Sequence, residues 1–233
     1  MRKKGWATGS AIFFFCVLGA ANDGHAGDAY RAMAPLAQYQ MASPFAEVAL
    51  ARSAAPASIS GDAEVMTFGD HGYRTEVKGK NEFVCLVWRS WGAGVDDAEF
   101  WNPKIRAPIC LNAAAARSVL PNYLERTKWV LAGSSKSDVI SRIKAAMAAN
   151  RFLMPEPGAM CYMMSKQGYL ADANGHWHPH LMFFLAHIDA AAWGANLDDS
   201  PVFAGQSEPD PVTTFLIPVT QWSDGTPADA QMR

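Results

Sequence analysis

Three histidines alternate with other residues in one short segment, Gly175-His176-Trp177-His178-Pro179-His180. In an extended chain, side chains two residues apart point to the same side. A residue that precedes a proline is restricted to extended conformations, which favours this geometry at His178. We therefore expect the imidazoles of His176, His178 and His180 to share one face.

Imidazole nitrogens bind divalent metals, and the spacing limits how many of these histidines can reach one ion. Alpha carbons two residues apart lie about 6.6 Å from each other, and those four apart about 13 Å. With a metal–nitrogen bond of about 2.1 Å, adjacent members can share an ion, whereas His176 and His180 would be strained. We expect two ligands from the segment and further ligands from this set of candidates: Asp172, His187, Cys161 and Asp189.

Zinc is the first choice for the metal because it prefers imidazole ligands. Copper is the second choice, because soft thioethers favour Cu(I) and four methionines lie in the same predicted hairpin: Met160, Met163, Met164 and Met182. A bound ion would polarise water for hydrolysis, with Asp172 or Asp189 as the base. Two interpretations without a metal remain open, namely acid–base chemistry by the histidines and a structural role. No catalytic residue is assigned.

A sheet is expected to position the histidines. Strand patterns occupy residues 64–68, 73–78, 82–90, 159–164, 181–187 and 213–220. The strands at 159–164 and 181–187 would pair antiparallel, and the connection of about sixteen residues between them is long enough to suggest a function. We expect the strands at 73–78 and 82–90 to form a hairpin around Gly79-Lys80-Asn81. The second of these is apolar on both faces, as in a central strand.

Helix signals complete the expected fold. Ser43 and Pro44 predict a helix over residues 43–54 that buries Phe45, Val48 and Ala49. Further helices are expected after Asn112, after Pro121 and after Ser135, where Ser135-Lys136-Ser137-Asp138 resembles a capping box. Residues 91–110 have no period and are expected to form a long loop. The prediction is a single α+β domain, mainly an antiparallel sheet of about five to six strands with helices packed on it.

Aromatic residues offer a second kind of site. Trp88, Trp91 and Trp101 lie around the expected loop, and Trp177 lies within the histidine segment. Exposed rings of this kind stack on small ligands. The alternative to a metal site is therefore a non-enzymatic envelope protein that binds a ligand or a partner through loop aromatics.

The first residues predict export. Arg2, Lys3 and Lys4 precede an apolar run at residues 11–21, which is too short to span a bilayer. We expect a signal peptide at residues 1–26, a helical segment at 27–60, an α+β domain at 61–222 and a loose tail at 223–233. The expected location is periplasmic or secreted, without a stable membrane span after cleavage.

The net charge excludes some classes of partner, and the cysteines allow a disulfide. Cleavage after Ala26 leaves 17 basic and 21 acidic side chains, a charge of about −4, which argues against a nucleic-acid or anionic-membrane partner. The expected partner is a small molecule or a metal ion. Cys85, Cys110 and Cys161 remain in the exported chain, where an oxidising compartment allows one disulfide. The pairing is open between Cys85 with Cys161 and Cys110 with either, and three buried thiols are the alternative.

Three segments of the chain resemble segments of other proteins. They are Gly175 to Phe184 (Gly-His-Trp-His-Pro-His-Leu-Met-Phe-Phe), Gly158 to Ser165 and Phe83 to Val87. Together they resemble a group of exported bacterial proteins described only as hypothetical, and the likeness covers most of the mature chain. The resemblance implies one exported domain and no particular activity.

Overall fold

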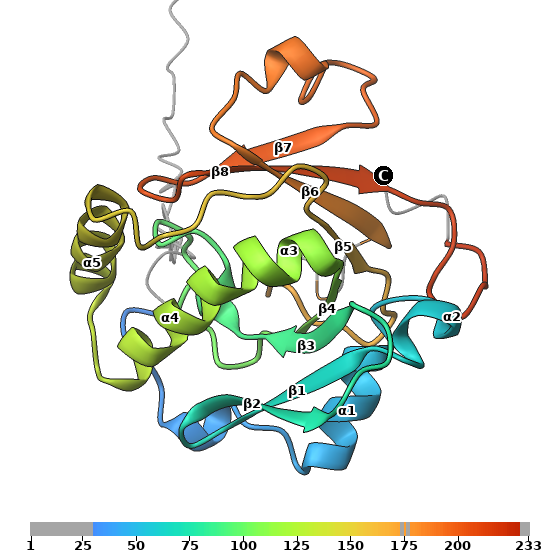
Figure 1. The fold of residues 1–233 in the computed structure, drawn as a ribbon, viewed down its shortest axis with the longest axis horizontal. Helices are drawn as coiled ribbons and strands as arrows, with labels where there is room; N and C mark the ends of the chain where they lie inside the picture. Colours follow the sequence, from blue (N-terminus) through green and yellow to red (C-terminus); the bar gives the residue numbers. More distant parts are fainter. Residues whose placement is uncertain (1–29, 173–174, 176–177, 229–233) are drawn as a thin grey trace, which may run out of the picture.

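A single mixed sheet of eight strands forms the centre of the protein (Figure 1). The computed structural model describes residues 30–172, 175 and 178–228. The strands are β1 (Glu64–Gly69), β2 (Gly72–Val77), β3 (Val84–Trp88), β4 (Ala107–Leu111), β5 (Met160–Met163), β6 (His180–Ala186), β7 (Phe203–Gln206) and β8 (Val212–Pro218). Their order is β2-β1-β3-β4-β5-β6-β8-β7, and the neighbours are antiparallel except for the parallel pair β1 and β3.

Helices pack on both faces of this sheet. The α-helices are α1 (Pro44–Arg52), α2 (Ala57–Ser60), α3 (Ala113–Ser118), α4 (Leu120–Leu131) and α5 (Lys136–Ala148). Short 3-10 helices are η2 (Leu36–Gln38), η3 (Ser90–Gly92) and η4 (Ala191–Trp193). The predicted α+β class, a mainly antiparallel sheet with helices packed on it, is confirmed.

Each face of the sheet has its own apolar cluster. The larger cluster includes buried residues of α3, α4 and α5 together with Leu86, Ile109, Leu111, Cys161, Met182 and Phe184. The smaller cluster includes residues of α1 together with Val65, Cys85, Val87 and Cys110. Strand β3 contributes alternate residues to both clusters, so the prediction of a central strand here is confirmed.

The expected hairpin between residues 73–78 and 82–90 is wrong. Strand β2 turns back through Asp70 and His71 to pair with β1, and β3 then joins the other edge of β1 in parallel. The connecting chain passes so close to the start of β1 that a Cβ on Gly79 would lie 2.5 Å from the backbone nitrogen of Glu64. The glycine therefore permits a backbone crossing instead of a tight hairpin turn.

Two strands were missed, which explains why the sheet has eight strands where six were expected. Residues 91–110 were expected to be a loop, but β4 occupies the end of this range and all its residues are buried. Pro108 made this segment unlike a strand in sequence, because proline has no N–H to donate to a neighbouring strand. Strand β5 pairs only with Cys110 and Leu111, so the first half of β4 is an edge on that side, where proline is tolerated. Strand β7 is short and mostly exposed.

The buried face of α1 also differs from the prediction. Ser43 caps the helix as expected, because its side chain accepts a hydrogen bond from the Ala46 N–H at 3.1 Å. Phe45, however, is 85 % exposed, and the helix buries Glu47, Leu50 and Ala51 instead. The reason is that Glu47, only 2 % exposed, forms an ion pair of 2.8 Å with the buried Arg89.

The other helix caps match the sequence. The Asn112 side chain accepts a hydrogen bond from the Ala115 N–H at 3.0 Å at the start of α3. At the start of α5, the Ser135 side chain accepts from the Asp138 N–H, and the Asp138 carboxylate accepts from the Ser135 N–H. The predicted capping box is confirmed, and it fixes where the chain enters α5.

The end of the described chain is bound to the rest of the domain. The Ser223 N–H donates to the carbonyl of Met164 at 2.9 Å, and Lys166 forms an ion pair of 2.8 Å with Asp224. Residues 223–228, expected to be loose, are thus held by hydrogen bonds. Within the described residues, no helix has the length and apolar character needed to cross a membrane.

Candidate functional site

The histidine segment leads directly into the sheet. His180 is the first residue of β6, and the residue is only 2 % exposed. Its Nδ1 lies 2.7 Å from the carbonyl oxygen of His178, and since a carbonyl only accepts, the proton of the neutral ring is on Nδ1. Burial lowers the pKa of His180 below its ordinary value. His176 and Trp177 lie outside the described residues, so a face shared by three histidines stays a prediction.

Asp172, a predicted ligand, already has four partners. Its carboxylate accepts hydrogen bonds of 2.5 Å from the hydroxyls of Tyr30 and Tyr169, of 3.2 Å from Lys104 and of 3.1 Å from Asn102. These bonds, that of Tyr169 first, hold the pKa of this carboxyl well below its usual range. A metal at Asp172 would have to displace some of these donors.

The remaining predicted ligands are dispersed. Nδ1 of His187 lies 3.9 Å from the Glu208 carboxylate, and Asp189 accepts a hydrogen bond from the N–H of Ala191. Cys161 is buried in the larger apolar cluster. Across residues 30–172, 175 and 178–228, no three His, Cys, Asp or Glu side chains are grouped so that they could hold a metal ion. The metal site therefore stays a prediction that depends on His176.

The cysteines fall on opposite faces of the sheet. Cys85 of β3 lies directly opposite Cys110 of β4, and the two form a disulfide in the cluster beneath α1. Cys161 of β5 lies opposite Leu111 and is a free thiol in the cluster on the other face. This pairing is one of those left open by the sequence. The disulfide is consistent with an oxidising compartment outside the cytoplasm.

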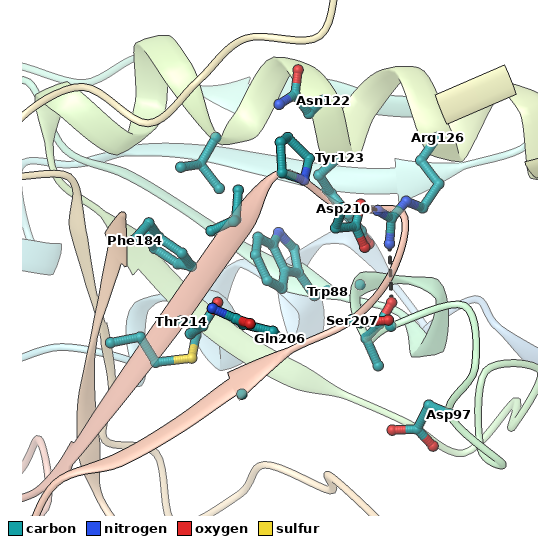
Figure 2. Close-up of a pocket in the computed structure, with 18 of the residues that line it drawn as sticks. Trp88, Asp97, Asn122, Tyr123, Arg126, Phe184, Gln206, Ser207, Asp210 and Thr214 are labelled. Carbon is teal, nitrogen blue, oxygen red and sulfur yellow. Dashed lines mark hydrogen bonds and ion pairs between the residues drawn. The ribbon is translucent and has the colours of Figure 1, made fainter. Parts of the chain in front are cut away.

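The described residues also enclose a pocket that the sequence did not indicate (Figure 2). The pocket has a volume of about 460 Å³ and lies between helix α4 and the adjacent strands β6, β8 and β7. Two connections complete its wall, the loop 92–97 and the segment 207–211 that joins β7 to β8. Elements from the middle and the end of the chain thus meet at this site.

The inner wall of the pocket is apolar. Met182 and Phe184 of β6 and Leu216 of β8 contribute side chains from the sheet, and Trp88 lies beside them. The Trp88 ring packs against the Tyr123 ring of α4, with the centroids 4.8 Å apart. The alternation of β6 explains this wall, because Met182 and Phe184 point to the same face as α4.

The other end of the pocket carries charge. Arg126 of α4 forms an ion pair with Asp210 and donates hydrogen bonds to the carbonyls of Trp91 at 3.2 Å and Ala93 at 3.0 Å. The side chains of Arg126 and Asp210 are only 8 % and 17 % exposed. Burial raises the pKa of Asp210 above its usual value, although Arg126 opposes this shift. The pair links the helix layer to the β7–β8 connection.

Two glycines let the loop 92–97 approach its neighbours. A Cβ on Gly92 would lie 2.9 Å from the Trp88 ring, and a Cβ on Gly94 would overlap with the Ser207 side chain. The Ser207 hydroxyl in turn donates a hydrogen bond to Asp96. These contacts join the two connections at the charged end of the pocket.

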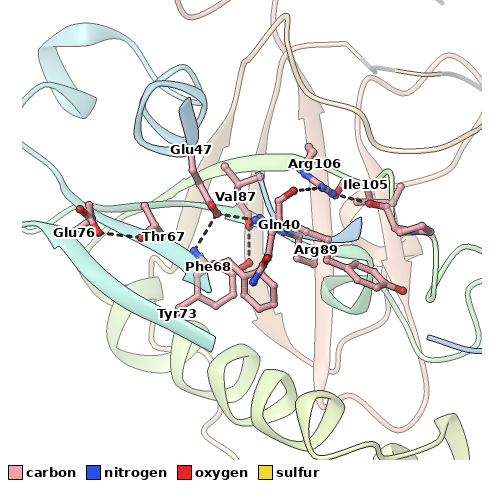
Figure 3. Close-up of polar contacts among 12 residues, drawn as sticks. Gln40, Glu47, Thr67, Phe68, Tyr73, Glu76, Val87, Arg89, Ile105 and Arg106 are labelled. Carbon is pink, nitrogen blue, oxygen red and sulfur yellow. Dashed lines mark hydrogen bonds and ion pairs between the residues drawn. The ribbon is translucent and has the colours of Figure 1, made fainter. Parts of the chain in front are cut away.

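A second polar cluster lies in the core and has a structural role (Figure 3). Arg89 donates to the carbonyls of Tyr39 and Val87 and to Glu47, and its guanidinium lies 4.8 Å from the centre of the Phe68 ring. Glu47 also accepts a hydrogen bond from the Phe68 N–H at 3.1 Å. These contacts satisfy both buried charges, and none of the described groups involved needs a ligand to complete its bonding.

The predicted tryptophans separate into two groups. Trp91 and Trp101 are buried in the core, and the indole N–H of Trp91 donates to Thr127 at 2.9 Å. Only Trp88, among the three around the expected loop, lines the pocket. Sequence reasoning missed Arg126 of α4 and Asp210 of the β7–β8 connection, because charged residues on helices and in connections usually face solvent. The one available signal was the tryptophan-rich, glycine-rich stretch at residues 88–94.

Comparisons with known proteins add no further assignment. No protein-family model matches the chain, and comparison with curated proteins and with solved structures gave no significant match. The resemblance to exported bacterial proteins therefore stays a prediction. The α+β fold and the geometry of the pocket are therefore the structural basis for a function.

Proposed function

We propose that this protein binds a small organic molecule in the pocket between α4 and strands β6, β8 and β7, and that it does so without catalysing a reaction. The observation that carries the proposal is a cavity of about 460 Å³ with an apolar wall at one end and a buried ion pair at the other. Small-molecule sites are typically cavities of about 300–1,000 Å³ with few polar groups in an apolar lining.

The lining suits an amphipathic ligand. Trp88 and Phe184 offer aromatic surface to an apolar body, while Arg126 and Asp210 mark the end where a polar group would lie. Burying a flat apolar fragment against such a wall contributes about 25 cal/mol for each Å² removed from water. This proposal keeps the aromatic-binding alternative drawn from the sequence, and Trp88, of the three tryptophans Trp88, Trp91 and Trp101, lines the pocket.

Gly205 offers a clean test of the pocket. It lies on β7 opposite Thr214, which also lines the pocket, and a Cβ at Gly205 would meet no atom within 4 Å. Gly205→Leu should fill the cavity without displacing a neighbour. Ala204→Leu is the matched control, because residue 204 points to the opposite face of the same strand.

The measurement uses 2-phenylethanol and 2-phenylethylamine as probes in ligand-observed NMR and calorimetric titration. We expect at least one of them to bind the wild-type protein, to bind Ala204→Leu equally well and to lose at least tenfold in affinity for Gly205→Leu. Binding that is the same in both leucine variants would place the ligand elsewhere and overturn the proposal.

We also propose that the protein works outside the cytoplasm, in the periplasm or after secretion. The basic start, the apolar run at residues 11–21 and the Cys85–Cys110 disulfide support this. Mass spectrometry of the exported chain should show Gly27 as the first residue. A full-length chain retained in the cytoplasm with reduced thiols would contradict it.

A metal site at His176, His178 and His180 is the second candidate function. The specific observation in its favour is that Nδ1 of His180 donates a hydrogen bond to the carbonyl of His178, because histidines that bind a metal usually donate their other ring N–H to such an acceptor. Zinc, with copper second, would then support metal-assisted hydrolysis with Asp172 or Asp189 as the base. This candidate requires His176, which lies outside the described residues.

Metal analysis of untagged protein tests this candidate. Stoichiometric zinc or copper that is lost in His178→Ala but kept in His71→Ala would support it. His71 is the matched control, since it is exposed, lies in the turn between β1 and β2 and is not a candidate ligand. Metal-free protein whose melting temperature is unchanged by a chelator would rule it out.

A further inference from the structure

The charges at the polar end of the pocket do not balance. Arg126 is the basic residue of the described lining, and its NH1 and NH2 groups already bind two carbonyls and Asp210. The lining also holds two carboxylates, those of Asp97 and Asp210. Since the guanidinium compensates one of them, one negative charge is left over at this end.

The surroundings do not remove this excess. Asp96 adds a carboxylate next to the pocket, bonded to Ser207, and Lys136 adds one cation. The Lys136 ammonium donates to the backbone carbonyl of Asp97 at 2.7 Å and lies 5.3 Å from the centre of the Phe100 ring. Two cations, Arg126 and Lys136, then face three carboxylates, and the net charge of this group is still −1. The three carboxylates are those of Asp96, Asp97 and Asp210.

The aromatic wall favours the same kind of ligand. Trp88 lines the cavity, and the face of an indole ring attracts cations more strongly than any other side-chain ring. Phe184 adds a second ring to the apolar wall. A positively charged group would thus be attracted by the carboxylates and by the rings, whereas a negatively charged group would be repelled by Asp97.

We infer that the ligand of this pocket is an organic ammonium ion, that is, an amine carried on an apolar body. This inference rests on the proposed binding function and names the class of ligand. The apolar body lies along Phe184 and the neighbouring apolar wall, and the ammonium group lies beside the Trp88 ring at the charged end of the pocket, near Asp97 and Asp210. Arg126 acts as a positioning residue, because it holds Asp210 at the pocket and contacts no ligand itself.

Three probes of nearly equal size separate charge from shape. They are 2-phenylethylamine, 2-phenylethanol and 3-phenylpropionate, which carry a cation, a neutral group and an anion at pH 7. We expect the amine to bind about fivefold more tightly than the alcohol, which corresponds to about 1 kcal/mol, and the anion to bind most weakly. The preference should shrink at high ionic strength, because salt screens exposed charges.

Asp97→Asn is the decisive variant. Asp97 Oδ1 accepts a hydrogen bond from the Glu99 N–H at 2.7 Å, which the asparagine oxygen can keep, so the variant removes the charge and retains the turn. It should abolish most of the preference for the amine over the alcohol. Asp62→Asn is the matched control, because Asp62 is an exposed carboxylate paired with Lys80 outside the pocket lining.

The outcomes distinguish the inference from the proposed function. If the alcohol or the anion binds as tightly as the amine, and Gly205→Leu still blocks binding, the ammonium inference is overturned and the pocket proposal stands. If the amine is preferred but Asp97→Asn leaves that preference unchanged, the inference is also overturned. If Gly205→Leu blocks no probe, both proposals fail.

Discussion

Arg126 in helix α4 is paired with Asp210, which lies 84 residues further along the chain in the β7–β8 connection. The pair joins the helix layer to the last strands of the sheet and forms one end of the pocket (Figure 2). Because both side chains are largely buried, removing one partner leaves the other as an uncompensated charge.

Arg126→Met should therefore destabilise the domain by about 3 kcal/mol, measured as the free energy of unfolding in urea. The double variant Arg126→Met with Asp210→Leu should recover most of this loss, because the buried carboxylate is also removed. Lys128→Met is the control for loss of a cation on the same helix, since Lys128 is exposed. A single variant within about 0.5 kcal/mol of wild type, which is the usual range for a surface substitution, would contradict this role.

Gly94→Ala should destabilise the contact between the two connections. The new Cβ would overlap with the Ser207 side chain, and overpacking of this kind costs about 1–3 kcal/mol. The new Cβ would also lie 2.6 Å from Oδ1 of Asp96, an exposed side chain that can move aside. Ser207→Gly in the same chain should relieve the overlap with residue 207, so a double-mutant cycle in urea should show a favourable coupling. Additive effects of the two changes would mean that the contact is looser than the structure indicates.

In the mature chain, Cys85 and Cys110 should stabilise the fold through their disulfide, whereas Cys161 should be a free but unreactive thiol. Replacing both Cys85 and Cys110 by alanine should lower the free energy of unfolding by about 3 kcal/mol, because their disulfide closes a loop with a sequence separation of 25.

Cys161 should resist iodoacetamide in the native state, since burial raises the pKa of its thiol well above the ordinary value. In urea without a reductant, mass spectrometry should find one labelled thiol. Two or three labelled thiols would contradict the disulfide.

His180 should make the domain sensitive to mild acid. Burial lowers its pKa below the ordinary 6.5, so the unfolded chain takes up a proton before the folded protein does. The free energy of unfolding should then fall as the pH drops below 6.5, by at most about 1.4 kcal/mol per pH unit. His180→Asn, compared with His187→Asn in urea melts from pH 7 to pH 5, should flatten this dependence. Equal slopes in wild type and His180→Asn would exclude His180 as the cause.

Much of the secondary structure could be predicted because its signals are local. The caps at Ser43, Asn112 and Ser135 are set by residues within one turn of each helix. The β5–β6 pair was predicted from two apolar strands in sequence, and it forms as expected. The same local reasoning failed at β4, where Pro108 reduced a signal that burial in the sheet overrides.

The candidate site was predictable only in part. The histidine segment stands out because its residues are adjacent in sequence, whereas the pocket is built from residues that are far apart. Glu47 shows why such features are hidden: the sequence predicted Phe45, Val48 and Ala49 on the buried face of α1, and the ion pair with Arg89 buries Glu47 instead. No pattern within one segment reveals a partner from another.

By itself, the sequence determined the elements with strong local signals, the α+β class and the expectation of export, because these depend on short-range periodicity, capping and composition. Only the tertiary structure decided the parallel placement of β3 beside β1, the pairing of Cys85 with Cys110 and the meeting of Arg126 with Asp210. These features depend on strand order and on contacts across the sheet, where the packing of distant segments outweighs local preference.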